Sequence, residues 1–312
     1  CTGSHPVILP IEGLSRSRGI PPFTPVADSA KGEEAAKDIE YLTNENIFSL
    51  ENLPESLIVL GGGPIGVELA QALNRLGVKV YIVEMRERIL FREDREIARV
   101  LENRLKDEGV EILAGRKAIR FSRKGNRVIA TLEDKNKNQE EITAENVLVV
   151  VGRAPNIEGL GLEKAGVAYT KTGITVNGFL QTTNENIFAC GDVVGPYMFS
   201  HVAAYQAQVC ARNALFKKIA WQKVNYENIA WAIFTEPEVA HLGLTEDEAR
   251  QKYKSIRVYK TAYSASDRAV TDLEKEGLLK IITDKKGFIL GAHIAGAQSS
   301  EIIQGFLIAK SL

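Results

Sequence analysis

Three glycines stand out for their chemistry, in the spacing Gly61-x-Gly63-x-x-Gly66. This spacing is typical of loops that hold a dinucleotide. Gly61 permits a tight turn, Gly63 lets a pyrophosphate approach the main chain, and Gly66 lets the following helix pack on the preceding strand. The N-terminus of that helix supplies free N–H groups for the pyrophosphate. Pro64 and Ile65 lie within the same loop and belong to the candidate site.

An acidic residue completes this pattern. Glu84 lies 18 residues after Gly66, at the end of a second predicted strand. A carboxylate here accepts hydrogen bonds from the hydroxyls of an adenosine ribose and repels a 2′-phosphate, which favours NAD over NADP. Arg86 and Arg88 nearby act against that preference. A glycine-rich turn that only packs is the alternative interpretation, and the strand, the helix and Glu84 together favour the nucleotide.

A second candidate site follows a strand later in the chain. Gly191-Asp192 comes directly after Ile187–Cys190. Gly-Asp is a common turn pair, but an aspartate at the C-terminal end of a sheet strand can also hold a ligand hydroxyl. Ser200 is expected to cap the next helix, whose N-terminus favours a negative or electron-rich group.

Residues 51–152 must position the glycine loop, and their pattern alternates between strands and helices. Buried strands are predicted at Leu57–Leu60, Val78–Ile82 and Val147–Val151. The helix between the first two ends at Gly77. Its predicted apolar face consists of Ile65, Leu69, Leu73 and Leu76. The order strand, helix, strand, helix predicts a parallel sheet that is covered on both faces.

A second helix and a hairpin complete this region. Asp94 is expected to cap the helix, and Gly109 is expected to end it. Its predicted apolar stripe consists of Ile97, Val100, Leu101 and Leu105. The alternating segments Ile119–Phe121 and Val128–Leu132 are joined through Lys124-Gly125-Asn126, which predicts a β-hairpin.

The rest of the chain changes character. Residues 153–222 predict a loop, a strand at Ile187–Ala189 and a helix over His201–Lys217. Residues 223–312 predict an α+β domain with an antiparallel sheet. Its predicted elements are a strand at Phe234–Pro237 that ends in a turn, a helix with capping-box spacing at Thr245 and Glu248, and strands at Leu278–Ile282 and Phe288–Leu290.

Composition limits the possible functions. The 312 residues predict about two domains. The 39 basic and 40 acidic residues nearly cancel, so there is no basic excess for nucleic acid. The longest aliphatic run, Val147–Val151, is far shorter than the ~20 residues that cross a bilayer, so no membrane partner is expected. The cysteines Cys1, Cys190 and Cys210 form no Cys-x-x-Cys pair, and a reducing cytoplasm is expected.

Five segments in order carry a resemblance to a known family. They are Thr2-Gly3-Ser4, the Gly61–Gly66 loop with Glu68, Val151–Asn156, Ile187–Asp192, and Phe234–Glu238 running on to Thr245. Over essentially all 312 residues the chain resembles the pyridine nucleotide–disulfide oxidoreductases, which are flavoproteins. The segments Phe91–Asp94 and Met198–Val202 resemble the mercuric-reductase-like and lipoamide-dehydrogenase-like branch.

The resemblance implies an α/β fold with Rossmann-like FAD and NAD(P) domains and a C-terminal α+β interface domain. The implied FAD-binding domain comes in two segments, residues 1–50 and 153–222. Residues 51–152 would bind NAD, and residues 223–312 would form the interface of a homodimer.

The resemblance also assigns roles to single residues. Glu68 would lie near the nicotinamide carboxamide and Glu84 on the ribose. Asp192 would contact the ribityl chain of FAD. The other residues implied at the FAD and NAD sites are Thr2, Gly3, Gly152, Arg153 and Gly191, together with the main chain of Met198, Phe199, Ser200 and His201, which would face the flavin pyrimidine ring.

Three family features are missing from these residues. They are the first glycine-rich FAD loop, the Cys-x-x-x-x-Cys redox pair and the C-terminal His-x-x-Pro-x-x-x-Glu segment. We therefore expect a chain that is cut at both ends, whose catalytic residues lie outside it and which is inactive alone. Cys190 and Cys210 are expected to be inert core thiols, and no His or Cys spacing predicts a metal site.

The predicted parent is an FAD-dependent NAD(P)H oxidoreductase that passes electrons to a disulfide or a metal ion such as Hg(II). Two alternatives remain open. One is a flavin NADH oxidase, quinone reductase or transhydrogenase without a redox cysteine pair. The other is a truncated nucleotide-binding module without turnover. An upstream cysteine pair would favour the first prediction over the oxidase.

Overall fold

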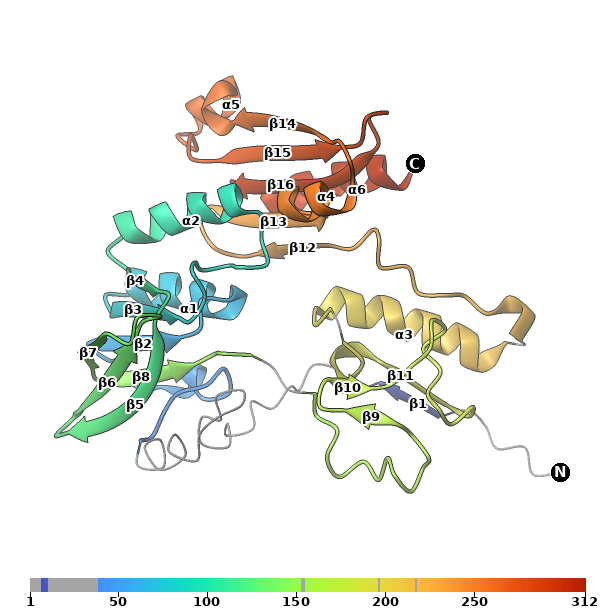
Figure 1. The fold of residues 1–312 in the computed structure, drawn as a ribbon, viewed down its shortest axis with the longest axis horizontal. Coiled ribbons are helices and arrows are strands. Elements are labelled where there is room, and N and C mark those ends of the chain that lie inside the picture. Colours follow the sequence, from blue (N-terminus) through green and yellow to red (C-terminus); the bar gives the residue numbers. More distant parts are fainter. Residues whose placement is uncertain (1–6, 11–38, 153–154, 196, 217) are drawn as a thin grey trace. The chain divides into compact units, whose positions relative to one another are not determined.

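The computed structural model describes residues 7–10, 39–152, 155–195, 197–216 and 218–312. The chain divides into two compact units (Figure 1). The first unit comprises Cys1–Gly19 and Arg153–Glu227, and the second comprises Ile20–Gly152 and Asn228–Leu312. The glycine loop and Glu84 therefore belong to the second unit.

A four-stranded parallel sheet lies in the second unit, in the order β4-β3-β2-β8. Its strands are β4 (Glu111–Ala114), β3 (Lys79–Glu84), β2 (Ser56–Leu60) and β8 (Asn146–Val149). β2 and β3 confirm two predicted strands. β8 ends at Val149 and not at Val151, because its partner β2 ends at Leu60 and turns into the glycine loop.

Two helices, α1 (Pro64–Arg75) and α2 (Arg95–Asp107), lie on one face of this sheet. In α2 the predicted cap is confirmed, because the Asp94 side chain accepts from the Glu96 N–H at 3.1 Å. The predicted apolar face of α1 was wrong in part. Leu76 is 65% exposed, whereas Val67 and Ala70 are fully buried. The close contact of Gly66 with Gly61, the residue after β2, fixes the rotation of α1, so the residues beside and one turn beyond Gly66 face the sheet.

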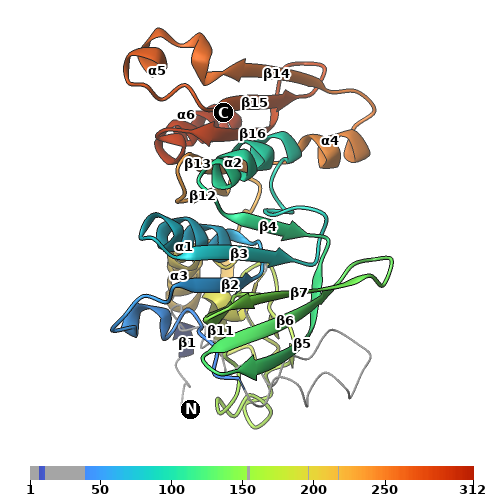
Figure 2. The ribbon, with the colours of Figure 1, turned by 90° about the vertical axis from the view of Figure 1, so that its left-hand side faces the viewer.

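Three antiparallel strands cover the other face. They are β5 (Lys117–Lys124), β6 (Arg127–Glu133) and β7 (Gln139–Ala144), and Figure 2 shows them beside the parallel sheet. Ile58 and Leu60 of β2 pack against Val128 and Ala130 of β6. The predicted hairpin is confirmed, and the parallel sheet is covered on both faces as predicted. The third strand, β7, is mostly polar and exposed, so its sequence shows no apolar alternation.

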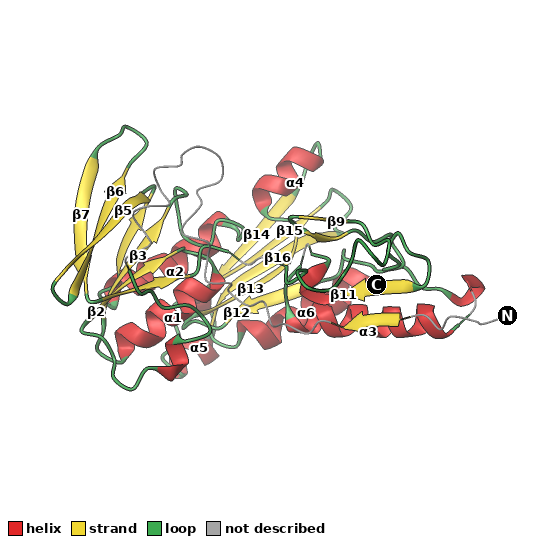
Figure 3. Ribbon diagram, turned by 90° about the horizontal axis from the view of Figure 1, so that it is seen from below, coloured by secondary structure: helices red, strands yellow, loops and turns green. Residues whose placement is uncertain are grey.

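A second, antiparallel sheet follows in the same unit, in the order β12-β13-β16-β15-β14 (Figure 3). Its strands are β12 (Ala230–Ile233), β13 (Glu238–Gly243), β16 (Ile289–Gly296), β15 (Leu278–Thr283) and β14 (Arg257–Ala262). α6 (Ser299–Ser311) packs on one face through Ile303 and Phe306, and α2 packs on the other. The mixed α/β fold with a C-terminal α+β domain is therefore as predicted.

Of the two predictions for the connections of this sheet, the strand is wrong and the capping box is confirmed. Phe234–Pro237 is not a strand but the turn between β12 and β13, since Pro237 has no N–H to donate to a ladder. The capping box of Thr245 and Glu248 is present at the start of α4 (Glu246–Lys252). α5 (Asp267–Thr271) follows β14.

The first unit is built around one parallel strand pair. β1 (Val7–Pro10) pairs with β11 (Ile187–Cys190), and α3 (Ser200–Leu215) packs on β11. α3 thus begins one residue before the predicted His201 and ends at Leu215. A small hairpin joins β9 (Tyr169–Thr170) to β10 (Gly173–Ile174). Across both units the short 3-10 helices are η1 (Ile47–Ser49), η2 (Gly191–Val193), η3 (Lys218–Ala220) and η4 (Tyr263–Ala265).

A row of polar side chains crosses the antiparallel sheet in register, one on each strand. The paired neighbours are Trp231 with His241, His241 with His293, His293 with Lys280, and Lys280 with Lys260. Residues that pair directly across neighbouring strands share one face of a sheet. These five residues, called here the cross-sheet row, therefore lie on the face that meets α2.

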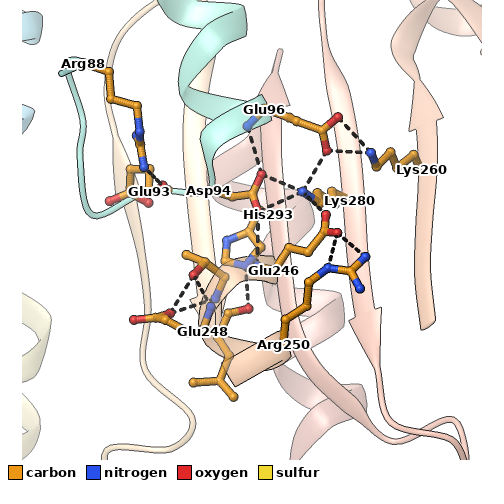
Figure 4. Close-up of polar contacts among 12 residues, drawn as sticks. Arg88, Glu93, Asp94, Glu96, Glu246, Glu248, Arg250, Lys260, Lys280 and His293 are labelled. Atoms are coloured by element: carbon orange, nitrogen blue, oxygen red, sulfur yellow. Dashed lines mark hydrogen bonds and ion pairs between the residues drawn. The ribbon is translucent and has the colours of Figure 1, made fainter. Parts of the chain in front are cut away.

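The start of α2 brings carboxylates onto this row (Figure 4). The Lys280 Nζ lies 2.9 Å from both oxygens of Asp94, 2.8 Å from Glu96 and 2.6 Å from Glu246. The side chains of Lys280 and Asp94 are each only 2% exposed. Burial lowers the pKa of Lys280, but the hydrogen bonds to these carboxylates outweigh burial and raise it above its usual value. The amine therefore stays charged and fully paired.

A further carboxylate, that of Glu93, meets the other end of the row. Glu93 accepts a hydrogen bond from the Trp231 Nε1 at 3.0 Å and lies 2.8 Å from the His241 Nδ1. The Nε2 of His241 lies 2.8 Å from the carbonyl oxygen of Gly243, and its ring stacks on Trp231 with 3.7 Å between ring centroids. The two ring nitrogens of His241 thus lie against two different oxygens, one of Glu93 and one of the main chain.

These contacts change the protonation of the buried groups. Burial raises the pKa of Glu93, but the charge of His241 and its hydrogen bond outweigh burial and hold that pKa below its usual range. For His293, burial and the neighbouring charge of His241 lower the pKa to about 3. The His293 Nε2 lies 2.9 Å from the Leu244 carbonyl oxygen, so the neutral ring donates there.

Replacing Lys280 should test how much the buried ion pair contributes. Lys280→Met leaves the Asp94 carboxylate buried without its main partner, so we expect the free energy of unfolding in urea to fall by about 3–5 kcal/mol. Lys106→Met is the control, since it removes only an exposed pair with Glu102 and should cost under ~0.5 kcal/mol. Equal losses in the two variants would contradict the role given to Lys280.

Acid should destabilise this unit through His293. The folded ring stays neutral down to about pH 3, whereas the unfolded ring takes up a proton near pH 6.5. The His293 titration therefore leaves the free energy of unfolding unchanged above about pH 6.5. Below that pH it lowers the free energy of unfolding by at most about 1.4 kcal/mol per pH unit. Thermal melts between pH 7 and 5 measure this loss. His293→Gln keeps a donor for Leu244 and cannot titrate, so its melting temperature should fall less steeply, and an unchanged slope would refute the assignment.

Candidate dinucleotide-binding site

The glycine loop joins β2 to α1 by a close contact. Gly61 has a φ of +111°, and a Cβ there would lie 2.6 Å from the Val150 carbonyl oxygen. A Cβ on Gly66 would lie 2.0 Å from the Gly61 carbonyl oxygen. A larger residue at Gly66 would push the helix away from the loop, and one at Gly61 would push the loop away from the main chain after β8. Both glycines are therefore needed to hold the N-terminus of α1 at the end of β2.

Gly63 differs from the other two glycines. A Cβ added there would meet no atom of the described residues within 4 Å, so among those residues space lies open beside its main chain. Gly63 is the N-cap residue of α1, Pro64 and Ile65 form the first turn, and no side chain caps it. A helix N-terminus with open space beside it is suited to a pyrophosphate.

Glu84 ends β3 directly beside this loop. One of its carboxylate oxygens accepts from the Gly62 N–H at 2.7 Å and the other from the Arg86 N–H at 2.8 Å. These two hydrogen bonds fix the half-buried carboxylate beside the loop. Its remaining lone pairs can still accept from two neighbouring hydroxyls, as a ribose presents them.

The two arginines that follow Glu84 are both engaged. The Arg86 guanidinium lies over the Phe91 ring at 4.3 Å. Arg88 donates to the carbonyl oxygens of Leu90, Phe91 and Glu93 at 2.6–2.8 Å. Burial also lowers the pKa of Arg88. Arg88 therefore orders the segment between β3 and α2.

Glu68 lies on α1, two residues after Gly66. Its Oε1 accepts from the Phe234 N–H at 2.8 Å. Burial raises the pKa of Glu68, and this hydrogen bond opposes the rise. No local pattern predicts this contact, because the two residues are 166 positions apart.

The predicted turn Gly191-Asp192 lies in the first unit. Gly191 has a φ of +80° and lies in η2, directly after β11. Its N–H donates to the Gln206 side chain at 2.6 Å, and Gln206 in turn donates to the Tyr226 hydroxyl. Asp192 is buried. Neither Gln206 nor Tyr226 belongs to a sequence motif, so these two hydrogen bonds were not predicted.

The start of α3 corrects one prediction. Ser200 is the first helical residue and not the cap, because Phe199 occupies the N-cap position. No described side chain caps this end, and the rings of Phe199 and His201 stack on each other. Met198 precedes them. The first N–H groups of α3 therefore remain the donors that this end can offer to an electron-rich ligand.

Several predicted residues belong neither to the glycine loop with Glu84 nor to the turn Gly191-Asp192 with the start of α3. Gly152 is exposed, with a φ of +155°. Thr2, Gly3, Arg153 and Cys1 lie outside the described residues. Cys190 and Cys210 are buried as predicted, and the Cys210 thiol lies 3.7 Å from the Ala189 carbonyl oxygen.

Two kinds of feature are absent from the described residues. Within those residues, no three His, Cys, Asp or Glu side chains are grouped so that they could hold a metal ion. In the same part of the chain, no helix has both the length and the apolar character needed to span a bilayer.

Comparison with known proteins identifies the family. Residues 1–207 match the model of the pyridine nucleotide-disulphide oxidoreductases, and residues 229–312 match the dimerisation domain of the same family. The chain belongs to the pyridine nucleotide-disulphide oxidoreductase family.

Its curated relatives include two kinds of enzyme. A dihydrolipoyl dehydrogenase from Thermus scotoductus is 39% identical over 84% of this chain and 57% of its own length. A mercuric reductase from Bacillus cereus is 32% identical over 92% of this chain and 45% of its own length. The chain thus spans about half the length of these relatives, which are of the kinds that the resemblance predicted.

Solved structures agree with this assignment. The Cu(II) complex of RclA, an HOCl-induced flavoprotein disulfide reductase from Escherichia coli, has a TM-score of 0.79 at 30% identity, over 87% of this chain and 60% of that one. LpdA from Mycobacterium tuberculosis has a TM-score of 0.78 at 28% identity, over 86% of this chain and 58% of that one.

Two alanine substitutions should separate packing from ligand contact. Gly66→Ala places a methyl group against the Gly61 carbonyl, so the melting temperature should fall by several degrees. Gly63→Ala meets no protein atom, so it should leave the melting temperature within about 2 °C of wild type but weaken NADH binding at least about tenfold. NADH fluorescence titration measures the affinity. Wild-type affinity in Gly63→Ala would contradict a pyrophosphate beside Gly63.

Proposed function

We propose that this chain is the coenzyme-binding and dimer-forming part of an FAD-dependent NADH oxidoreductase of the disulfide-reductase type. Its electron acceptor is a disulfide or a metal ion such as Hg(II). When bound, the nicotinamide supplies a hydride that the flavin takes up and passes on as electrons. The observation that carries the proposal is the fixed Glu84 carboxylate beside the open N-terminus of α1. The acceptor class is supported by the dihydrolipoyl dehydrogenase and mercuric reductase relatives.

In this proposal residues 51–152 bind NADH. Gly61, Gly63 and Gly66, with the first turn of α1, hold the pyrophosphate, and Glu84 accepts from the adenosine ribose hydroxyls. Glu68 lies near the nicotinamide carboxamide. The open space beside Gly63 and the hydrogen bonds that fix Glu84 fit such a ligand.

We infer a preference for NADH over NADPH. A 2′-phosphate would lie against the fixed, negative Glu84 carboxylate. The sequence left Arg86 and Arg88 as possible partners for that phosphate. Arg88 is committed to three main-chain carbonyls and Arg86 to the Phe91 ring, which supports the preference for NADH.

The first unit contributes to the FAD site in this proposal. Asp192 contacts the ribityl chain, and the main chain from Met198 to His201 faces the flavin pyrimidine ring. The buried carboxyl group and the helix N-terminus without a side-chain cap fit these tasks, because such an end stabilises negative charge on a bound ring. Thr2, Gly3, Gly152, Arg153 and Gly191 complete the proposed coenzyme contacts.

The second copy of this chain is the proposed protein partner. Residues 223–312 form the interface of a homodimer, as the match to a dimerisation domain supports. On α6, Ile302 is 42% exposed and Ile308 is 59% exposed. Burying such side chains between two copies favours association by about 25 cal/mol per Å² of apolar surface.

The complete protein, purified from its source, tests the proposed function. We expect bound flavin in its absorption spectrum and NADH oxidation that depends on an added disulfide or on Hg(II). Oxidation at the same rate with oxygen or a quinone alone would instead support a flavin oxidase without a redox cysteine pair. Absence of flavin would overturn the proposal.

Charge reversal at Glu84 tests the coenzyme preference. Glu84→Arg removes the ribose acceptor and supplies a partner for a 2′-phosphate, so the ratio of kcat/KM for NADH to that for NADPH should fall at least about tenfold. Glu84→Gln is the control, since it keeps an acceptor and adds no positive charge, and it should move the ratio less. An unchanged ratio in Glu84→Arg would remove Glu84 from the ribose site.

A further inference from the structure

Three side chains on one side of α1 contact the turn Phe234–Pro237 of the antiparallel-sheet domain. Glu68, Gln71 and Arg75 are spaced three and four residues apart, which places them on the same side of a helix. Glu68 accepts from the Phe234 N–H, as described above. Arg75 forms an exposed ion pair with the Glu236 carboxylate at 2.6 Å. The coenzyme helix is therefore bound directly to the turn between β12 and β13.

Gln71 makes the strongest anchor of this turn. Its side chain is buried, and it accepts from the Glu236 N–H at 2.8 Å while donating to the Glu236 carbonyl oxygen at 2.7 Å. One amide thus pairs in both directions with the main chain of a single residue. Such paired hydrogen bonds in a buried place fix the turn more firmly than an exposed ion pair does.

The position of the turn matters for the charge of Glu68. Burial disfavours the ionised carboxylate, and the Phe234 N–H favours it by donating to Oε1. A carboxylate can accept from a carboxamide NH2 group, whereas the protonated acid presents one oxygen as a donor. Since Phe234 is two residues before Glu236, any loosening at Gln71 draws this N–H away from Glu68.

We propose that Gln71 is a positioning residue for the nicotinamide. It holds the turn Phe234–Pro237 against α1 and so keeps the Phe234 N–H on Oε1 of Glu68, which favours the ionised carboxylate and leaves its second oxygen to accept from the carboxamide. This inference rests on the proposed function, in which Glu68 lies near the nicotinamide. It gives the antiparallel-sheet domain a part in binding the coenzyme.

The test is the pH dependence of NADH binding to this chain, followed by fluorescence between pH 5 and 9. Gln71→Met removes both hydrogen bonds to Glu236 at nearly constant volume. We expect its binding midpoint to move to higher pH by about one unit, because Glu68 loses a donor. Glu68→Gln, which cannot titrate there, should flatten the profile.

Arg75→Met is the matched control, because it removes an ion pair from the same turn and leaves the main-chain contacts. Its profile should match wild type. If Gln71→Met does not fold, Gln71→Asn shortens the same amide and should give the same shift. A wild-type profile in the folded Gln71 variant, or an equal shift in Arg75→Met, would overturn the inference. Failure of the wild-type chain to bind NADH would instead overturn the proposed function itself.

Discussion

The buried contact between the start of α2 and the cross-sheet row is the constraint on which the second unit depends. On the antiparallel sheet, His241 lies against Glu93, Lys280 against Asp94, and Lys260 against Glu96, each within hydrogen-bond distance. Losing one partner leaves an unpaired charge away from water, which costs several kcal/mol. The parallel sheet and the antiparallel sheet are therefore fixed together as one unit, and neither can shift without breaking these pairs.

The start of α2 is connected to the glycine loop through the segment that precedes it. The segment from Arg88 to Glu93 joins β3 to the start of α2, and its Leu90 N–H donates to the Gly62 carbonyl oxygen at 2.8 Å. On the other side of the loop, α1 is bound to the turn Phe234–Pro237 through Glu68 and Gln71. The glycine loop is thus held on one side by the segment that precedes α2 and on the other, through α1, by the turn of the antiparallel-sheet domain. A rigid loop of this kind needs little further ordering when a dinucleotide binds.

Local signals in the sequence predicted most of the elements, and contacts between distant segments were missed. The cap at Asp94 and the capping box at Thr245 depend on three or four consecutive residues, so they could be read directly. The buried face of α1 was misjudged because Gly66, and not the larger apolar residues, sets the rotation of the helix. The cross-sheet row depends on the register of strands up to 62 residues apart, from Trp231 to His293, and no local pattern encodes that register. The glycine loop and Glu84 could be predicted, whereas the contacts of Gln71 with Glu236 could not.

The central claim is that a dinucleotide binds along the glycine loop and Glu84. Amide hydrogen exchange of the 312-residue chain, with and without NADH, tests it most directly. Binding at this site predicts slower exchange at residues 61–68 and 84–90 and no change in the β5–β7 strands. Unchanged exchange at residues 61–68 in excess NADH, or slowing that is confined to other parts of the chain, would contradict the claim.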